Sequence, residues 1–256
     1  MALKLPRGVT KIGSWAFNGC TLLESIDLSA CIRLTDAGYG IENDAFAGCT
    51  ALKTVIMPTG APWMKKIRRD AFKGCKALSS IDLSGFMELT TIEASTFQDC
   101  TALKEVRLPK KLTTIGTDAF KNCPIETLVI HCDIKDSIIT EFTYKADSAK
   151  TLTLGEGVTV IGANAFQSLF YLEEADLSAC TTLTRIEAEA FFACTRATIK
   201  LPESITTIGS QAFGDSAALD ESCCKKVLIK SGAEYNRIKG LVTGSGYPEA
   251  RIEAYN

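Results

Sequence analysis

The sequence predicts an α/β solenoid, in which short repeats coil one after another around a shared core. Three observations predict it: an Ile recurs five residues before a Phe, a Cys often follows that Phe by three residues, and an alternating apolar segment precedes each block. Counting a degenerate copy at Phe142, successive Phe residues are 22 to 29 residues apart. A period in the twenties that covers most of a chain is typical of solenoids.

The repeated Phe and Cys residues are predicted to form the core. Residues three apart on one helical turn share a face, so each Phe and its Cys should point inward together. The Phe series is Phe17, Phe46, Phe72, Phe97, Phe120, Phe166, Phe191 and Phe213, and the Cys series is Cys20, Cys49, Cys75, Cys100, Cys123 and Cys194.

Each repeat is expected to contain two strands and one helical turn. Leu103 to Leu108 shows the first strand, whose last three residues alternate inward, outward and inward. Pro109 follows this strand and should end its pairing. Leu112 to Gly116 reads as the second, shorter strand, and the residues around Phe120 as the helical turn. First strands of successive repeats should then pair in parallel on one face, with short strands and helical turns on the other.

We expect a single domain. Residues 1–230 should form an array of about nine coils, and residues 231–256 a capping segment with a helix and a final strand. Each repeat of a solenoid contacts mainly its neighbours, so an array has no internal domain boundary. The chain opens without a signal peptide, and we expect it to come from a longer precursor whose export signal has been removed.

Composition excludes several functional classes. The chain has 256 residues, 28 basic and 30 acidic side chains and a net charge of −2, so no overall field attracts nucleic acid or an anionic membrane. No apolar run is long enough to span a bilayer. The cysteine count of eleven could suggest a disulfide scaffold, but the regular offset from Phe favours buried, reduced thiols. One or two disulfides between neighbouring repeats remain an alternative.

The outward positions of the first strands are the candidate ligand-binding face. In a parallel solenoid these side chains form columns, and such extended surfaces commonly bind ligands. The alternative is that they are ordinary solvated positions of a strand. The candidates are Asp27, Asp82, Glu105, Arg107, Thr127, Thr151, Thr153, Glu174, Asp176 and Lys200, together with Trp63 in a loop insertion.

No catalytic, metal or cofactor site is predicted. The expected separation of Asp27 and Asp82, about 10 Å, does not exclude hydrolysis, but nothing nearby predicts a pocket or a raised pKa, so we expect no hydrolase. His131 is the only histidine, and no Cys-x-x-Cys pair is present, which argues against structural zinc. Gly155-Glu-Gly157 lacks the third glycine of a nucleotide loop. The basic residues around Ile67 read as a solvated edge.

The repeat resembles the BspA-like leucine-rich repeat family. The resemblance rests on Leu-x-x-Ile-x-Leu-Pro, Leu-Thr-x-Ile-Gly and Ala-Phe-x-x-Cys, best seen from Leu103 to Cys123. It implies a right-handed superhelix of the leucine-rich repeat type and a protein that is secreted or held at a microbial, bacterial cell surface. It also implies adhesin-like binding, with a host matrix or host-cell protein among the expected partners.

Two functions follow as hypotheses. The first is a non-enzymatic recognition module that binds a protein or glycan ligand through the outward strand face. The second is a structural spacer or stalk that presents another domain of a longer precursor. We expect a monomer that inserts into no membrane and binds no nucleic acid.

Overall fold

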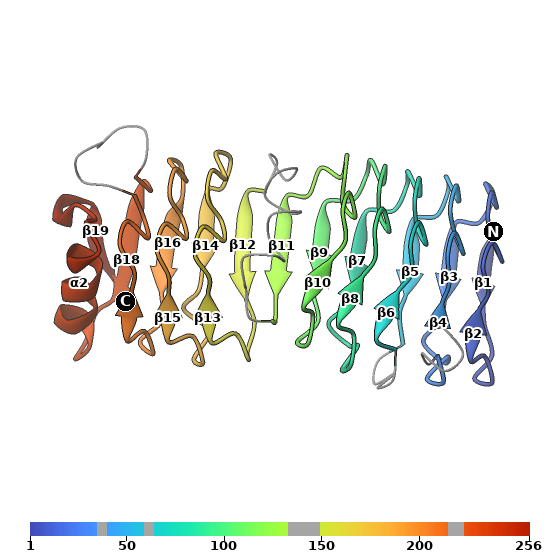
Figure 1. Ribbon diagram of the computed structural model, residues 1–256, viewed down its shortest axis with the longest axis horizontal. Helices are drawn as coiled ribbons and strands as arrows, with labels where there is room; N and C mark the ends of the chain where they lie inside the picture. Colours follow the sequence, from blue (N-terminus) through green and yellow to red (C-terminus); the bar gives the residue numbers. More distant parts are fainter. Residues whose placement is uncertain (35–39, 59–63, 133–148, 215–222) are drawn as a thin grey trace. The chain divides into compact units, whose positions relative to one another are not determined.

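Parallel strands from successive repeats pair in register over most of the described part of the computed structural model (Figure 1). The structure describes residues 1–34, 40–58, 64–132, 149–214 and 223–256. It comprises two compact units, Met1–Ile125 and Glu126–Asn256, which are described separately below. Trp63 and the degenerate repeat at Phe142 lie outside the described residues.

The first unit has two strand ladders built from the two predicted strands of each repeat. The first strands form a three-stranded sheet in the order β1-β3-β5 and a further parallel pair, β7 and β9, and the second strands form the ladder β10-β8-β6-β4-β2. The bounds are β1 Ala2–Lys4, β3 Ser25–Asp27, β5 Thr54–Ile56, β7 Ser80–Asp82, β9 Glu105–Arg107, β2 Lys11–Ile12, β4 Gly40–Ile41, β6 Lys66–Ile67, β8 Thr91–Ile92 and β10 Thr114–Ile115.

The second unit repeats this arrangement. Its first strands pair in the order β11-β12-β14-β16-β18-β19 and its second strands in the order β13-β15-β17. The bounds are β11 Thr127–Ile130, β12 Thr151–Leu154, β14 Glu174–Asp176, β16 Thr198–Leu201, β18 Lys226–Lys230, β19 Ile252–Tyr255, β13 Val160–Ile161, β15 Arg185–Ile186 and β17 Thr207–Ile208. The chain is a parallel-strand solenoid of about nine turns. Its handedness and the single-domain assignment stay predictions.

The Phe rings of each unit form a stack inside the ladders. Five rings, from Phe17 to Phe120, are stacked in the first unit with centroids 5.1–5.3 Å apart. Phe166, Phe191 and Phe213 are stacked in the second unit, at 5.1 and 6.0 Å. The parallel register places one Phe per coil over the next, and a buried ring contributes both apolar area and stacking. The core of each unit therefore extends along the ladder.

The predicted helical turn around each Phe is wrong. In the repeat of Phe46, the Ala47 N–H bonds to the Asp44 carbonyl and the Cys49 N–H to that of Phe46, which makes successive tight turns. The Phe46 N–H bonds instead to the Ala71 carbonyl of the next repeat, at 2.8 Å. The backbone around Phe thus forms a third ladder between repeats, where a helix would bond within itself.

Positive backbone angles cause this difference. In the described repeats from Phe17 to Phe191, the residues two before and two after the Phe adopt left-handed conformations, as Asp44 (φ 56°) and Gly48 (φ 72°) do around Phe46. Gly, Asn and Asp tolerate this region best, and a right-handed helix excludes it. Gly74, Asn122 and Asn164 hold such positions, so the sequence carries the signal.

The Cys thiols have a defined hydrogen-bond partner in the preceding repeat. The Cys49 Sγ lies 3.0 Å from the Phe17 carbonyl oxygen, which also accepts the Cys20 N–H. The later members bond in the same way to the preceding Phe carbonyl. All eleven cysteines are free. Cys224 takes the next slot of the series, because its Sγ lies 3.3 Å from the Phe191 carbonyl.

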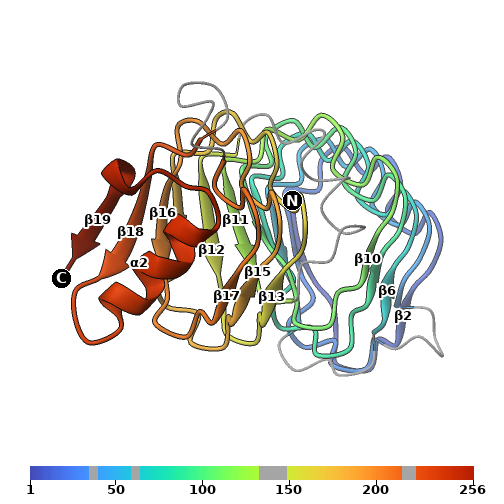
Figure 2. The same cartoon turned by 60° about the vertical axis from the view of Figure 1, so that its left-hand side comes forward.

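The C-terminal segment covers the last repeat of the second unit. Helix α2 (Tyr235–Gly244) buries Ile238 and Val242, and a short 3-10 helix, η3 (Glu249–Arg251), leads into β19. The Tyr247 ring meets Phe213 edge-on at 5.9 Å. Figure 2 shows α2 lying beside the strands at this end of the unit. The predicted helix and final strand are both present.

Candidate functional site

The outward positions of the first unit carry charges that pair locally. The Asp27 carboxylate in β3 forms an ion pair with Lys4 at 3.0 Å. In β9, Arg107 forms an ion pair with Glu105 at 2.9 Å. Ile56, in register with Asp27, is 47% exposed and interrupts the polar column. The negative charge of Asp27 is thus partly neutralised by Lys4.

Three of the candidate acids hold turns. Asp27, Asp82 and Asp176 each occur in the sequence Asp-Leu-Ser, and each accepts the N–H of the Ser two residues later, at 2.8–3.0 Å. Such side-chain-to-backbone bonds stabilise the chain where it leaves a strand. These carboxylates therefore have a structural role whether or not they bind a ligand.

Lys200 connects the outward acids of the second unit. Its Nζ lies 2.7 Å from Glu174 and 3.4 Å from Asp176, both on the neighbouring strand β14. Thr151 donates to the Thr127 hydroxyl at 3.1 Å, in the same column as Glu174. The acidic side chains of β14 and the basic side chain of Lys200 consequently form one mixed network.

The hydrogen bonds and ion pairs of these groups shift their pKa values. The bonds from Ser29, aided by Lys4, lower the pKa of Asp27 to about 2. Burial opposes ionisation of Asp176, but the bonds from Ser178 and the charge of Lys200 outweigh it and lower its pKa. The bond to Glu174 raises the pKa of Lys200. All three groups are therefore charged at neutral pH, and none is poised for acid–base chemistry.

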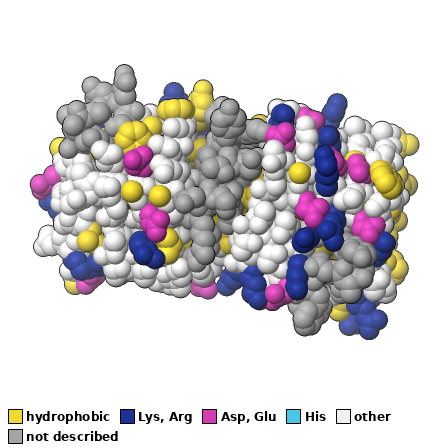
Figure 3. All heavy atoms as spheres, in the orientation of Figure 1, with side chains coloured by type: hydrophobic (Ala, Val, Ile, Leu, Met, Phe, Trp, Pro, Cys, Tyr) yellow, Lys and Arg dark blue, Asp and Glu magenta, His cyan; other side chains and the backbone are white. Residues whose placement is uncertain are grey.

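Acidic and basic side chains are also interspersed across the surface. On the right-hand side of Figure 3, which shows part of the first unit, Lys and Arg side chains lie next to Asp and Glu. No large area of a single sign appears on this face of that unit. This agrees with the near balance of charges in the sequence.

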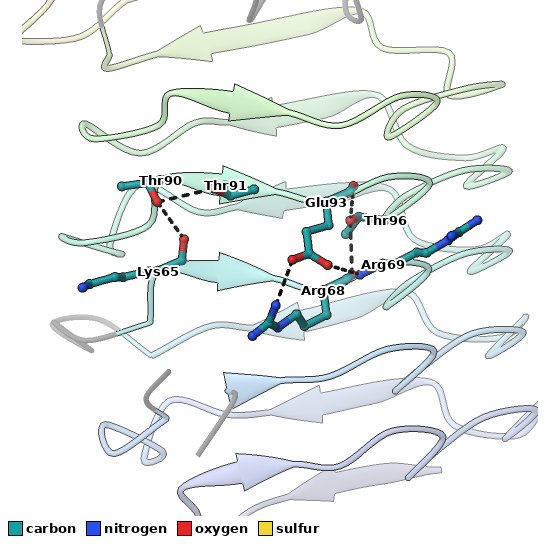
Figure 4. Close-up of polar contacts among 7 residues, drawn as sticks. All are labelled: Lys65, Arg68, Arg69, Thr90, Thr91, Glu93 and Thr96. Carbon is teal, nitrogen blue, oxygen red and sulfur yellow. Dashed lines mark hydrogen bonds and ion pairs between the residues drawn. The ribbon is translucent and has the colours of Figure 1, made fainter. Parts of the chain in front are cut away.

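The second-strand face of the first unit contains a polar cluster that sequence reasoning took for a solvated edge. Arg68 pairs with Glu93 at 3.0 Å, and the other Glu93 oxygen accepts the Arg69 N–H at 3.2 Å (Figure 4). Thr96, fully buried, donates to the Glu93 carbonyl at 2.6 Å. The cluster ties neighbouring repeats together through a carboxylate that binds both a side chain and the backbone.

A sequence signal for this carboxylate exists. Repeats that contain Asp-Leu-Ser continue with Ile-Glu, as at Glu42 and Glu93, whereas three repeats that contain Leu-Pro continue with Ile-Gly, at Gly13, Gly116 and Gly209. A Cβ on Gly116 would lie 2.5 Å from the Ala94 nitrogen, so the backbones approach too closely for a side chain. Glu42 likewise accepts the Ser14 N–H, at 2.9 Å.

Sequence reasoning also missed an exposed aromatic pair in the second unit. Phe170 and Tyr171 are 50% and 48% exposed, in the turn before β14. The Arg196 guanidinium lies 5.3 Å from the Tyr171 ring centre. The corresponding turn positions hold no aromatic residue in the repeats of Phe17, Phe46, Phe72, Phe97 and Phe191, for example Thr50 and Ala51. That departure from the repeat is the signal that could have found it.

Within the described residues, no group of three His, Cys, Asp or Glu side chains could hold a metal ion. His131 is half-buried rather than on the surface, since its ring occupies the space where a side chain on Gly155 would lie. None of the helices in the described part of the chain has the length and apolar character needed to cross a membrane. Trp63, the remaining candidate contact, is outside the described residues.

Comparison with known proteins agrees with the repeat analysis. Residues 1–39, 31–138 and 137–235 match the BspA type Leucine rich repeat region family, in six copies. No curated protein matches the chain.

Three solved structures similar to this chain include two that are described as leucine-rich repeat proteins. One, from Bacteroides ovatus, is 19% identical over 100% of this chain and 84% of its own, with a TM-score of 0.40. A leucine-rich repeat protein of T. pallidum is 22% identical over 77% of each chain, with a TM-score of 0.43. The pneumococcal vaccine antigen PcpA is 17% identical over 100% of this chain and 89% of its own, with a TM-score of 0.38.

Proposed function

Because this chain belongs to the BspA-type leucine-rich repeat family, we propose that it is a non-enzymatic recognition module. It binds a protein or glycan ligand at the cell surface or outside the cell, and host matrix or host-cell proteins are candidate ligands. The observation that carries this proposal is the pair of parallel ladders whose outward side chains stand in regular columns. Repeat arrays of this kind use such extended faces for binding.

Breaking the outward ion pairs to form contacts with a ligand requires little free energy. Lys200 and Glu174 keep 29% and 47% of their side-chain surface exposed, and Arg107 and Glu105 keep 45% and 40%. Exposed ion pairs contribute about 0–1 kcal/mol, so a charged ligand can compete for either partner. The buried Phe core keeps the columns in place while this happens.

A binding screen with two matched double variants tests the proposal. The probes are purified collagen and laminin and an array of defined glycans. Glu105→Ala/Arg107→Ala removes both members of an exposed pair in the first unit. Glu174→Ala/Lys200→Ala removes both members of a pair in the second unit and leaves Asp176 with its bond from the Ser178 N–H but without Lys200. Arg185→Ala, on the exposed part of the second-strand face, is the control.

The expected result is that a ligand found in the screen binds at least about tenfold more weakly to one double variant and equally to the control. Equal binding by all variants would remove the strand face as the site. Asp27, Asp82 and Asp176 are avoided as alanine variants because they hold turns. Their Asn variants keep an acceptor oxygen and can be added.

A second candidate is the structural spacer that presents another domain of a longer precursor. The observation that favours it is the local neutralisation of outward charge, as in the Lys200 network. Paired charges reduce the attraction for a charged partner. If no probe binds at sub-millimolar concentration, the spacer becomes the better explanation.

A further inference from the structure

The turn edge of the second unit differs from the rest of the array. We use this name for Phe170, Tyr171 and Arg196 together with Lys150 and Lys225. Three repeats place Thr-Ala or Lys-Ala where this one has Phe170-Tyr171, at Thr50-Ala51, Lys76-Ala77 and Thr101-Ala102. The fold therefore does not need aromatic rings there. Adjacent exposed aromatic side chains commonly mark a surface where another molecule binds.

Tyr171 and Arg196 occupy the same turn position in consecutive repeats. The residue after each one donates its N–H to the carbonyl three residues earlier, Leu172 to Leu169 at 3.1 Å and Ala197 to Cys194 at 2.9 Å. This equivalence places the Arg196 guanidinium over the Tyr171 ring, 5.3 Å from its centre. The ring holds the guanidinium by a cation–π contact and leaves its donors free for a carboxylate.

Further positive charge lies beside these residues. Lys150 and Lys225 are exposed and immediately precede β12 and β18, the strands that flank β14 and β16 in the sheet (Figure 1). Neither Lys150, Arg196 nor Lys225 makes an ion pair with any residue the structure describes, in contrast to Lys200 and Lys226 on the strand face. Two acidic side chains lie at the same edge: Glu173, which precedes β14, and Glu126, which precedes β11 in register with Lys150. The turn edge thus keeps a net positive charge that is not neutralised by the described residues.

We infer that the turn edge binds an acidic polypeptide segment that carries an aromatic or aliphatic side chain. The apolar side chain packs on Phe170 and Tyr171, and carboxylates pair with Arg196, Lys150 and Lys225. Tyr, Phe and Arg are the residue types enriched where proteins bind proteins. A sulfated glycan or nucleic acid would use dense charge and not the exposed rings, and the net charge of −2 opposes it.

This inference rests on the proposed recognition function, and it adds a site and a ligand class. The test uses three probes, a random copolymer of glutamate and tyrosine, polyglutamate and heparin, with binding followed by fluorescence anisotropy. The repeat itself supplies substitutions compatible with the fold: Phe170→Thr and Tyr171→Ala restore residue types found at these positions in other repeats. Leu22→Ala, at the position equivalent to Tyr171 in the first unit and 78% exposed, is the matched control.

We expect the unaltered chain to bind the glutamate–tyrosine copolymer about tenfold more tightly than polyglutamate, because only the copolymer offers rings. The Phe170→Thr/Tyr171→Ala variant should lose that tenfold preference and keep the unfolding midpoint in urea. Arg196→Ala and Lys150→Ala/Lys225→Ala should each weaken binding about three- to tenfold and reduce its salt dependence. Leu22→Ala should bind like the unaltered chain.

Three outcomes would overturn the inference. The first is that heparin binds more tightly than the copolymer. The second is that the Phe170→Thr/Tyr171→Ala variant binds the copolymer as the unaltered chain does. The third is that the copolymer does not bind at sub-millimolar concentration. The recognition function fails separately, because it is judged by the collagen, laminin and glycan screen. A ligand from that screen that depends on Glu105/Arg107 or Glu174/Lys200 but not on the turn edge would support the function and remove this site.

Discussion

The first repeat of the first unit and the last repeat of the second unit give the same core residues different surroundings. Phe17 contacts one stacked ring and is half-exposed, and Trp15 and Leu22 beside it are 64% and 78% exposed. Phe213 is fully buried between Phe191 and Tyr247. The comparison shows that a repeat residue stabilises the fold only as far as both of its faces are covered.

Truncating the two rings tests this comparison most strongly. Phe213→Ala should lower the free energy of unfolding by about 3–5 kcal/mol, because it leaves a cavity between packed rings. Phe17→Ala should cost about 1–2 kcal/mol, because part of that ring already contacts water. Urea-induced unfolding followed by circular dichroism measures both values. Equal losses would contradict the comparison.

The hydroxyl of Tyr247 should contribute part of the stability that the C-terminal segment gives to the last repeat. It donates to the Cys224 carbonyl at 3.0 Å in a buried site, so Tyr247→Phe leaves that oxygen with one fewer donor and should cost about 1–3 kcal/mol. Tyr255→Phe is the control, since its hydroxyl makes a longer, partly buried bond of 3.4 Å. A larger loss for Tyr255→Phe in the same unfolding experiment would show that the buried bond is not what matters.

The first and last repeats should also differ in the reactivity of their thiols, which can be measured without any mutation. Cys20 is half-exposed, whereas Cys224 is fully buried and burial raises its pKa. Burial also raises the pKa of Cys49, to about 11. Since the thiolate is the reactive form, iodoacetamide at pH 8 should label Cys20 in the native protein and spare Cys49 and Cys224. Mass spectrometry reads the pattern, and all eleven should react in denaturant. Native labelling of Cys224 would show that the end is not covered.

The ion pair that ties β1 to β3 makes the uncovered end sensitive to acid. The pKa of Asp27 is lowered from 3.8 to about 2 in the folded chain, so its contribution is present above pH 4 and is lost as the pH falls towards 2. Asp27→Asn keeps an acceptor for Ser29 but cannot pair with Lys4. Its stability deficit at pH 7 should therefore shrink in urea titrations repeated down to pH 2. Asp82→Asn, where the acid caps a turn without a described ion pair, should show a smaller deficit at pH 7.

Replacing Trp15 should give the smallest change in the free energy of unfolding. It adopts a left-handed conformation (φ 59°) that costs a bulky residue energy, and its ring is mostly in water. Asn164 holds the same position of its repeat at φ 56°. Trp15→Asn should therefore raise the free energy of unfolding by up to about 1 kcal/mol. A loss of stability would mean that the exposed ring contributes packing at this end.

Several features could be predicted because they repeat. The spacing from Ile41 to Phe46 and Cys49 recurs in most repeats, and recurrence at fixed offsets indicates residues that stack between neighbours. The helical turn was mispredicted because the offset of three between Phe and Cys fits both a helix and successive tight turns. Asp44 and Gly48 contained the deciding information, since both tolerate positive φ.

The candidate site was harder to predict, because whether an outward charge is free or paired depends on residues that are close in space and distant in the sequence. Asp27, Glu105 and Lys200 read as free outward charges in the sequence, yet each has an ionic partner close by. Phe170 and Tyr171 were overlooked because an apolar pair in a repeat protein reads as core. Their departure from the repeat was the signal in the sequence, and the exposure of their side chains in the structure identifies them as surface residues.

By itself, the sequence determined that the chain coils, which residues fill the core and where the array gives way to its C-terminal segment. These follow from the periodicity, because a repeat that cannot bury its apolar face alone must stack on a copy of itself. The tertiary structure decided which charges neutralise one another, which thiols meet a carbonyl and which rings stay in water. Such pairings depend on distances of a few ångströms between residues more than twenty positions apart, and no local pattern specifies those distances.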